Sequence, residues 1–230
     1  MIILAIDTSG PVCGVAVWAD GRIRYEAAAI NKLTHSESLM PMLDEALTRA
    51  GVDKKELTHL AVTVGPGSFT GVRIGVTAVK ALSHALNIPC IAVGSLEATA
   101  QGVDAADEII CPIQDARVMQ VYGAAFKNGE RLMDDCVLKL DEYLEKIAAF
   151  DGKFLFTGDG VLTYRQKIAE KLGERVRFAS AQCAYLRPAA VACAAAAHAD
   201  EAVDYLTLQP LYLRAPQAER ERAKKEAQHG

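Results

Sequence analysis

Residues 62–87 read VTVGPGSFTGVRIGVTAVKALSHALN and hold an apolar run, a glycine-rich turn and a second apolar segment. The run at 59–64 predicts a buried strand, and the spacing of apolar residues over 72–87 predicts a helix. That helix is expected to end at Asn87, because Pro89 follows. A strand, a tight turn and a helix in this order are typical of an α/β fold.

The turn at 65–75 (GPGSFTGVRIG) allows two interpretations. Three glycines between strand and helix let the backbone turn sharply and pass close to another surface, which is a structural role. Alternatively, free N–H groups at the helix start favour an anion, with Gly65 and Gly67 as possible nucleotide-binding residues. The turn lacks the GK[ST] ending of a P-loop, and it is not the GxGxxG that follows a first strand in dinucleotide-binding folds.

The residues before this unit predict three strands and a helix. Apolar runs cover 2–8, 12–19 and 22–29, and Asp20-Gly21 marks a tight turn between the last two. Thr34-His35-Ser36-Glu37 is a capping-box pattern that opens a helix to Ala50, with Gly51 as its stop. A strand at 90–93 and a short helix from Ser95 to Gln101 complete the order βββαβαβα. This order indicates one lobe (1–102) of an actin/Hsp70-like α/β fold, with mixed sheets flanked by helices.

The remaining residues predict a C-terminal lobe at 103–213, with a boundary near Gln101–Ala106. Strands are expected at 108–113, 118–127 and 154–157, and helices at 141–150, 160–171 and 188–199. An extended piece follows at 208–213. The stretch 214–230 is charged and without apolar spacing, so it is expected to be a solvated tail.

Asp7-Thr8-Ser9 follows the first strand and precedes a Gly10-Pro11 turn. In nucleotide-binding lobes such a hairpin brings N–H groups and hydroxyls to phosphate, and the acid holds magnesium through water. Asp7, Thr8 and Ser9 are therefore possible nucleotide-binding residues. In the other interpretation, Asp7 and Ser9 satisfy backbone groups of their own turn. Asp115-Ala116-Arg117, after another buried strand, could likewise pair internally or touch a ligand.

Composition excludes several classes of function. The 230 residues carry a net charge of −4, so no general basic field favours nucleic acid. The start MIILAID is unlike a signal peptide and no apolar run reaches 18 residues, so we expect a cytoplasmic protein without membrane contact. Six scattered cysteines lack metal spacing and are expected to be reduced and buried, and no nucleophile–base pair or metal cluster stands out. We therefore expect no catalytic residues and no metal site.

The helices at 34–50 and 72–87 are apolar over more than one face. A surface helix of a monomer needs an apolar sector a little over 100° wide, and these two exceed it. Either they form an interface with a partner, or the chain's own sheet and second lobe cover them. In the first interpretation the partner-binding residues are Leu39, Met42, Leu43, Ala46, Val72, Val76, Val79 and Lys80.

Five motifs in order give a resemblance that covers nearly the whole chain. They are Ala5-Ile6-Asp7-Thr8-Ser9, His35-Ser36-Glu37, GPGSFTGVRIG at 65–75, Asp115-Ala116-Arg117 and Pro210-Leu211-Tyr212-Leu213-Arg214. Together they resemble the TsaB (YeaZ) family of the actin/Hsp70-like superfamily. The resemblance implies a non-catalytic subunit in the synthesis of threonylcarbamoyladenosine, beside the anticodon of tRNAs that read codons beginning with A.

The resemblance also implies partners. The family is a paralogue of TsaD, the threonylcarbamoyl-transferring subunit, whose metal-binding His-x-x-x-His would fall here on Ser95 and Thr99. Hydroxyls without imidazole or carboxylate make a poor iron or zinc site. The family implies docking to TsaD through the first-lobe helices, a ternary complex with TsaE, a homodimer when alone and tRNA contact through the complex. No tightly bound cofactor is expected, although ATP or ADP with magnesium could bind at the complex interface. The alternative function is a small-molecule kinase or ATPase that acts alone through Asp7.

Overall fold

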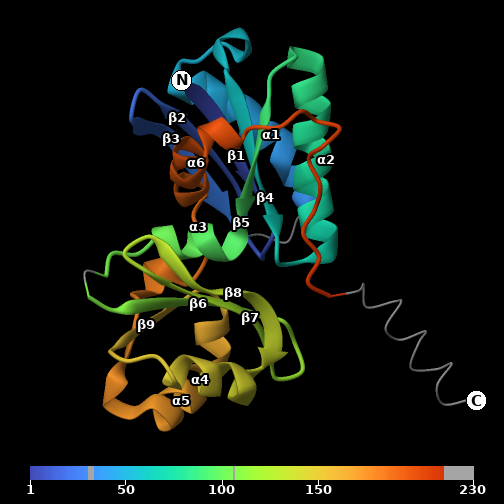
Figure 1. The fold of residues 1–230 in the computed structure, drawn as a ribbon. Coiled ribbons are helices and arrows are strands. Elements are labelled where there is room, and N and C mark those ends of the chain that lie inside the picture. Colours follow the sequence, from blue (N-terminus) through green and yellow to red (C-terminus); the bar gives the residue numbers. More distant parts are fainter. Residues whose placement is uncertain (31–33, 106, 215–230) are drawn as a thin grey trace, which may run out of the picture.

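The computed structural model describes residues 1–30, 34–105 and 107–214, which form two lobes stacked end to end (Figure 1). Each lobe is built on a five-stranded mixed sheet, in the strand orders β3-β2-β1-β4-β5 and β8-β7-β6-β9-β10. The predicted two-lobed α/β class with mixed sheets and flanking helices is therefore confirmed.

The first sheet follows the prediction closely. Asp20 and Gly21 both have left-handed φ angles of 54° and 82°, as a two-residue hairpin turn requires. The central strand β1 pairs antiparallel with β2 and parallel with β4, and β4 pairs parallel with β5. The strands of this first sheet are β1 (Ile2–Asp7), β2 (Cys13–Ala19), β3 (Arg22–Ala29), β4 (His59–Gly65) and β5 (Cys90–Gly94).

Local signals set the ends of the first-lobe helices. The Thr34 N–H donates to Glu37 Oε2 at 2.8 Å, and Gly51 ends the helix with a left-handed φ of 64°. Pro41 lies inside this helix without ending it. The next helix starts three residues earlier than predicted, because Ser68 caps it and the glycine turn is shorter. The helices are α1 (His35–Ala50), α2 (Phe69–Leu86) and α3 (Ser95–Gln101), with a 3-10 turn at Lys54–Glu56.

The second lobe repeats this strand order. Its central strand β6 pairs antiparallel with β7 and parallel with β9, as β1 does with β2 and β4. The sequence missed two edge strands: β8, which is half exposed and broken by charged residues, and β10, which is three residues long. The elements are β6 (Ile109–Asp115), β7 (Gln120–Lys127), β8 (Glu130–Lys139), α4 (Leu140–Ala148), β9 (Phe154–Thr157), α5 (Gly160–Leu172) and β10 (Val176–Phe178), with 3-10 turns at Gly173–Arg175, Ala181–Cys183 and Ala199–Glu201.

The last helix of each predicted range, 1–102 and 103–213, packs on the sheet of the other lobe. This corrects the expected domain limits. Helix α6 (Pro188–Ala197) covers the face of the first sheet away from α1 and α2, in a cluster that includes Val191 and Ile3. Helix α3 packs on the second sheet through Leu96 and Ala100. The range 103–213 is therefore not one lobe, because the chain returns to the first sheet at about residue 188. An alanine-rich helix has no polar face, so it is stable where two layers enclose it.

Residues 202–214, which we call the strap, continue along the first lobe beside α2 (Figure 1). Val203 and Cys90 exchange two backbone hydrogen bonds of 2.8 and 2.7 Å at the edge of β5. The expected extended piece at 208–213 lies in the strap, and Leu208 is buried in the first core. Of the predicted tail at 214–230, only Arg214 lies within the described residues.

All six cysteines are free thiols. Cys13, Cys90 and Cys111 are buried as predicted, whereas Cys136 and Cys183 are partly exposed and Cys193 is exposed. Within the three described ranges, no helix is long and apolar enough to span a bilayer.

Candidate functional site

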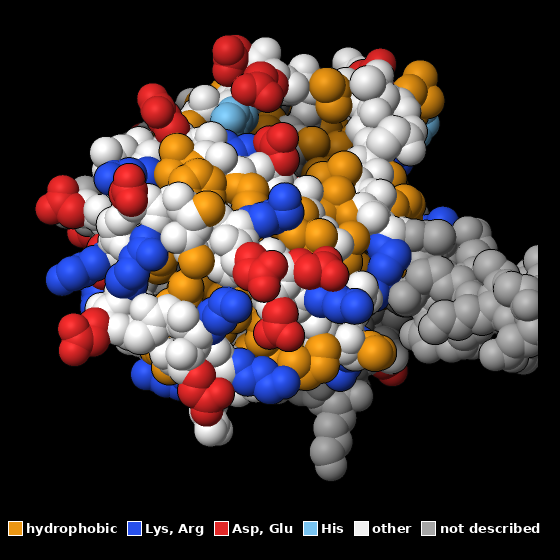
Figure 2. All heavy atoms as spheres, turned by 60° about the horizontal axis from the view of Figure 1, so that its bottom comes forward, with side chains coloured by type: hydrophobic (Ala, Val, Ile, Leu, Met, Phe, Trp, Pro, Cys, Tyr) orange, Lys and Arg blue, Asp and Glu red, His pale blue; other side chains and the backbone are white. Residues whose placement is uncertain are grey.

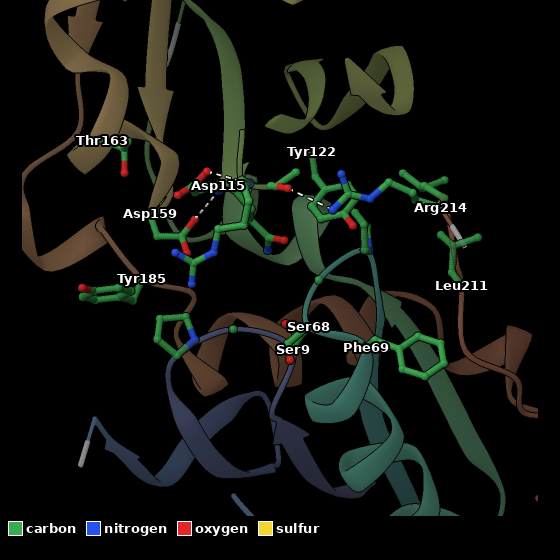
Figure 3. A pocket seen from close by; sticks show the side chains of 18 of the residues that line it. Ser9, Ser68, Phe69, Asp115, Tyr122, Asp159, Thr163, Tyr185, Leu211 and Arg214 are labelled. Atoms are coloured by element: carbon green, nitrogen blue, oxygen red, sulfur yellow. Dashed lines mark hydrogen bonds between the residues drawn. The ribbon is translucent and has the colours of Figure 1, made fainter. Parts of the chain in front are cut away.

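A cleft of about 580 Å³ lies between the two lobes (Figure 3). The β1–β2 turn and the β4–α2 turn form its first-lobe wall, where Ser9 and Ser68 lie side by side. The β6–β7 turn and the start of α5 form the opposite wall, with Asp115 and Asp159. Tyr122, Tyr185 and the end of the strap complete the lining. The cleft therefore collects the ends of the central strands of both sheets, where ligands commonly bind in α/β folds.

The glycines of the β4–α2 turn serve close packing of backbone against backbone. A Cβ atom on Gly67 would lie 2.3 Å from the Ser9 carbonyl oxygen, and one on Gly71 would lie 2.0 Å from that of Thr8. The Ser68 N–H donates to the same Ser9 oxygen at 2.7 Å, and Thr8 Oγ1 donates to the Gly71 carbonyl at 2.7 Å. The start of α2 is thus pressed against the β1–β2 turn, which supports the structural interpretation of the glycine motif.

Asp7 is buried beneath this turn. Its Oδ1 atom accepts hydrogen bonds from Ser9 N–H at 2.9 Å, Ser9 Oγ at 2.7 Å and Thr63 Oγ1 at 2.6 Å. Burial raises the pKa of the Asp7 carboxyl above its ordinary value, against the lowering effect of these hydrogen bonds. Asp7 borders only a small void beside the cleft, not the cleft itself. The alternative of an independent kinase or ATPase depended on Asp7, and this geometry does not favour it.

The five possible nucleotide-binding residues make close contacts within the chain. The Thr8 and Ser9 hydroxyls donate within the chain, and Asp7 accepts from its own turn. Gly65 and Gly67 face carbonyl oxygens, those of Leu211 and Ser9. Only Ser9 and Gly67 of the five line the cleft. The hydroxyls of Thr8 and Ser9 and one carboxylate oxygen of Asp7 are therefore engaged in hydrogen bonds within the chain.

Two carboxylates face the cleft from the second lobe. Asp159 Oδ1 accepts from the Asp115 N–H at 3.1 Å (Figure 3). Asp115 Oδ1 accepts from Tyr164 Oη at 2.8 Å. Burial, and after it the nearby Asp115 charge, raise the pKa of Asp159 to about 6. The sequence analysis left open whether Asp115 and Arg117 pair with each other. They do so through the backbone, because the Arg117 N–H donates to Asp115 Oδ1 at 2.9 Å. The sequence analysis did not single out Asp159. A signal was present, because the turn Gly158-Asp159-Gly160 lies between strand and helix in the second lobe as Gly65-Pro66-Gly67 does in the first.

The strap closes one side of the cleft. The Leu211 N–H donates to the Val64 carbonyl at 2.7 Å, and a Cβ on Gly65 would lie 2.5 Å from the Leu211 carbonyl oxygen. Arg214 then crosses to the second lobe, where it donates to Gln120 Oε1 at 2.8 Å and to the Ala116 carbonyl at 2.9 Å. Arg214 is thus part of the site and not of a solvated tail. Its place as the last residue of the motif at 210–214 was the available signal.

Most of the expected partner-binding residues are core residues, which corrects the surface assigned to them. Six of the eight side chains are at most 4% exposed and pack within the first lobe: Leu39, Leu43, Ala46, Val72, Val76 and Val79. Met42 and Lys80 are half-buried. The chain's own sheet covers the apolar faces that suggested an interface, so a partner on these helices must meet other side chains.

Ser95 and Thr99 are both buried and their hydroxyls bond to backbone. Ser95 Oγ donates to the Pro66 carbonyl, and Thr99 Oγ1 donates to the Ser95 carbonyl at 2.7 Å. Within the part of the chain that the structure describes, no group of three His, Cys, Asp or Glu side chains is placed to share a metal ion.

Comparisons with known proteins agree on one group of relatives. A family model described as "TsaD: tRNA N6-adenosine threonylcarbamoyltransferase" matches residues 29–222. The tRNA threonylcarbamoyladenosine biosynthesis protein TsaB of Bacillus subtilis is 37% identical over 95% of this chain and 96% of its own length. TsaB of Escherichia coli is 33% identical over 70% of this chain and 72% of its own.

Solved structures give the same result for the fold. YeaZ from Pseudomonas aeruginosa superposes with a TM-score of 0.77 at 28% identity, over 92% of this chain and 99% of its own. The ROK hexokinase of Thermus thermophilus superposes with a TM-score of 0.50 at 14% identity, over 86% of this chain and 99% of its own. At that identity the likeness shows the fold alone, and it supports the predicted actin/Hsp70-like class.

Proposed function

Because this chain belongs to the TsaB (YeaZ) family of tRNA threonylcarbamoyladenosine biosynthesis proteins, we propose that it is a non-catalytic subunit that binds and supports TsaD in the cytoplasm. TsaD would transfer the threonylcarbamoyl group, and TsaE would join the two in a ternary complex. A second copy of this chain would occupy the TsaD-binding face when TsaD is absent.

The observation that carries this proposal is the chemistry at Ser95 and Thr99. The family resemblance aligns these positions with the metal-binding histidine pair of TsaD. Here both side chains are buried hydroxyls that donate to carbonyls of their own lobe. A site whose two positions hold neutral, occupied hydroxyls has the fold of the transferase without its metal ligands.

The docking face is proposed on the outward sides of α1 and α2. Met40 on α1 is 54% exposed, and Ala81 and Ala85 on α2 are exposed as well. Small exposed side chains along a helix let another helix approach closely, and methionine adapts to an irregular surface. Met42 and Lys80 are half-buried, so only part of each side chain is available to a partner.

Nucleotide and tRNA would reach this chain through the complex. ATP or ADP with magnesium is proposed only at the junction with TsaD, since the chain's own turn residues are occupied. On the face in Figure 2, which brings the second lobe forward, Lys and Arg side chains are interspersed with Asp and Glu. RNA phosphates bind best to a continuous basic patch, and mixed charges of this kind do not make one. We therefore propose that the partners, and not this face, supply the affinity for tRNA.

Reconstitution tests the role. Purified TsaD, TsaE and the threonylcarbamoyl-adenylate synthase are incubated with tRNA, ATP, threonine and bicarbonate, with or without this chain. We expect modified adenosine only when the chain is present. Equal modification without the chain would remove the proposed function.

Ala81→Glu tests the docking face without touching the core. A charge on this exposed helix position should weaken TsaD binding and shift the free protein from dimer to monomer in sizing experiments. Ala169→Glu on α5, also an exposed helical alanine, is the matched control. If both variants bind TsaD as tightly as the parent chain, the docking face lies elsewhere.

A further inference from the structure

The β6–β7 turn has an unusual backbone. Arg117, Val118 and Met119 have consecutive positive φ angles of 67°, 52° and 59°. Non-glycine residues rarely occupy this left-handed region, and it is least favourable for a β-branched residue such as Val118. Three in succession persist only where the surrounding structure holds them.

Hydrogen bonds from two directions hold the turn. The Ala116 N–H donates to the Gln120 carbonyl at 3.0 Å, and the Gln120 N–H donates to the Arg117 carbonyl at 3.1 Å. From outside the turn, the Arg214 guanidinium donates to both the Ala116 carbonyl and the Gln120 side chain, at 2.9 and 2.8 Å. A planar guanidinium is suited to such a two-point contact. Arg214 therefore clamps both ends of a strained turn.

Of the three strained residues, Val118 makes the least contact with its own lobe, whereas the Met119 carbonyl accepts from the Leu140 N–H at 2.9 Å and Met119 Sδ accepts from Lys167 Nζ at 3.7 Å. Val118 is 90% exposed and Met119 is 39% exposed. The Arg117 side chain is exposed, and no ion pair includes it among the residues that the structure describes. The side chain of Val118 thus gains almost no packing in return for its backbone conformation. Observed strain of this kind points to a binding role.

The turn is connected through the strap to the start of α2. Two residues before Arg214, the Tyr212 ring lies 4.8 Å from the Phe69 ring, and Arg73 Nε donates to Tyr212 Oη at 2.8 Å. Arg73 and Phe69 belong to the first turns of α2, the helix proposed to dock TsaD. A partner that covers the outer side of α2 can therefore reach the β6–β7 turn across the strap.

We propose that Arg117–Met119 is a preformed docking loop for TsaD, with Arg214 as its positioning residue. The loop fits a protein surface that has a small apolar pocket for Val118 and a carboxylate beside it for Arg117. This inference rests on the proposed function, because it assigns a second contact to the same partner. A small anion would need Arg117 alone, whereas the exposed Val118 and Met119 favour a protein surface.

Calorimetric titration of TsaD from the same organism into the full chain tests the loop. Val118→Asp and Arg117→Glu should each weaken binding by about tenfold or more, as substitutions at a central interface contact do. Leu132→Asp on β8, an apolar side chain that is 40% exposed, is the matched control and should bind as the parent does. All three positions are exposed, so we expect the variants to remain folded, which circular dichroism checks.

Amide hydrogen exchange separates positioning from contact. In the free protein, Arg214→Ala should speed exchange at residues 117–120 and weaken TsaD binding, whereas Val118→Asp should weaken binding without changing exchange there. Unchanged affinity of Val118→Asp would overturn the docking loop while leaving the proposed function intact. Affinity lost in Arg117→Glu alone would indicate an anion contact and would also overturn it. No binding by the parent chain would refute the proposed function and the loop together.

Discussion

Gly71→Ala tests directly whether the glycine motif serves packing. Gly71 lies in the first turn of α2, and an alanine Cβ there would come within 2.0 Å of the Thr8 carbonyl oxygen. That atom is backbone, so the β1–β2 turn or the helix must move. The movement would also break the buried hydrogen bond from Thr8 Oγ1 to the Gly71 carbonyl.

The expected loss of stability follows from three terms. Overpacking costs about 1–3 kcal/mol, and a buried hydroxyl left without its acceptor costs a further 1–3 kcal/mol or so. Alanine returns about 1 kcal/mol through its higher helix propensity. The net loss is about 3 kcal/mol, which for a chain of this size lowers Tm by roughly 6–12 °C.

Urea unfolding followed by circular dichroism measures this loss. Gly10→Ala is the matched control, because it lies in the same pair of turns but has no heavy atom within 4 Å of the added Cβ. The control should stay within about 0.5 kcal/mol of the parent. If Gly71→Ala is as stable as the parent, or more stable by its helix propensity, the packing argument is refuted.

Two further predictions concern the site carboxylate and the core. The pKa of Asp159 is about 6 in the folded protein, against an ordinary value of 3.8. The ionised carboxylate therefore destabilises the folded state above about pH 6, and this destabilisation disappears below about pH 4. Asp159→Asn should therefore stabilise the chain by up to about 3 kcal/mol at pH 8, less any solvent screening, and hardly at pH 4. Equal gains at both pH values in urea unfolding would contradict the burial of this carboxyl. Val76→Glu should unfold the first lobe, because Val76 is 3% exposed, whereas exposed Thr77→Glu should leave the circular dichroism spectrum unchanged.

Turns and helix ends could be predicted from the sequence, because the residues that cause them lie within a few positions of one another. The Asp20-Gly21 hairpin, the Thr34 cap and the Gly51 stop each depend on a side chain or a φ angle at one position. The order βββαβαβα followed from these signals together with the apolar runs between them. The edge strand β8 was missed since its half-exposed surface carries charges that interrupt the alternation of a typical strand.

The sequence by itself determined the two-lobed α/β class, the elements of the first lobe and, through its motifs, the family. It also showed that α1 and α2 have wide apolar faces. Only the tertiary structure decided what covers those faces, because periodicity cannot distinguish a chain's own sheet from a partner. The same limit applies to the glycine motif at 65–75: its turn was evident locally. No local pattern encodes contacts between distant parts of the chain. The structure was therefore needed to show that Gly65 packs against Leu211 and Gly71 against Thr8.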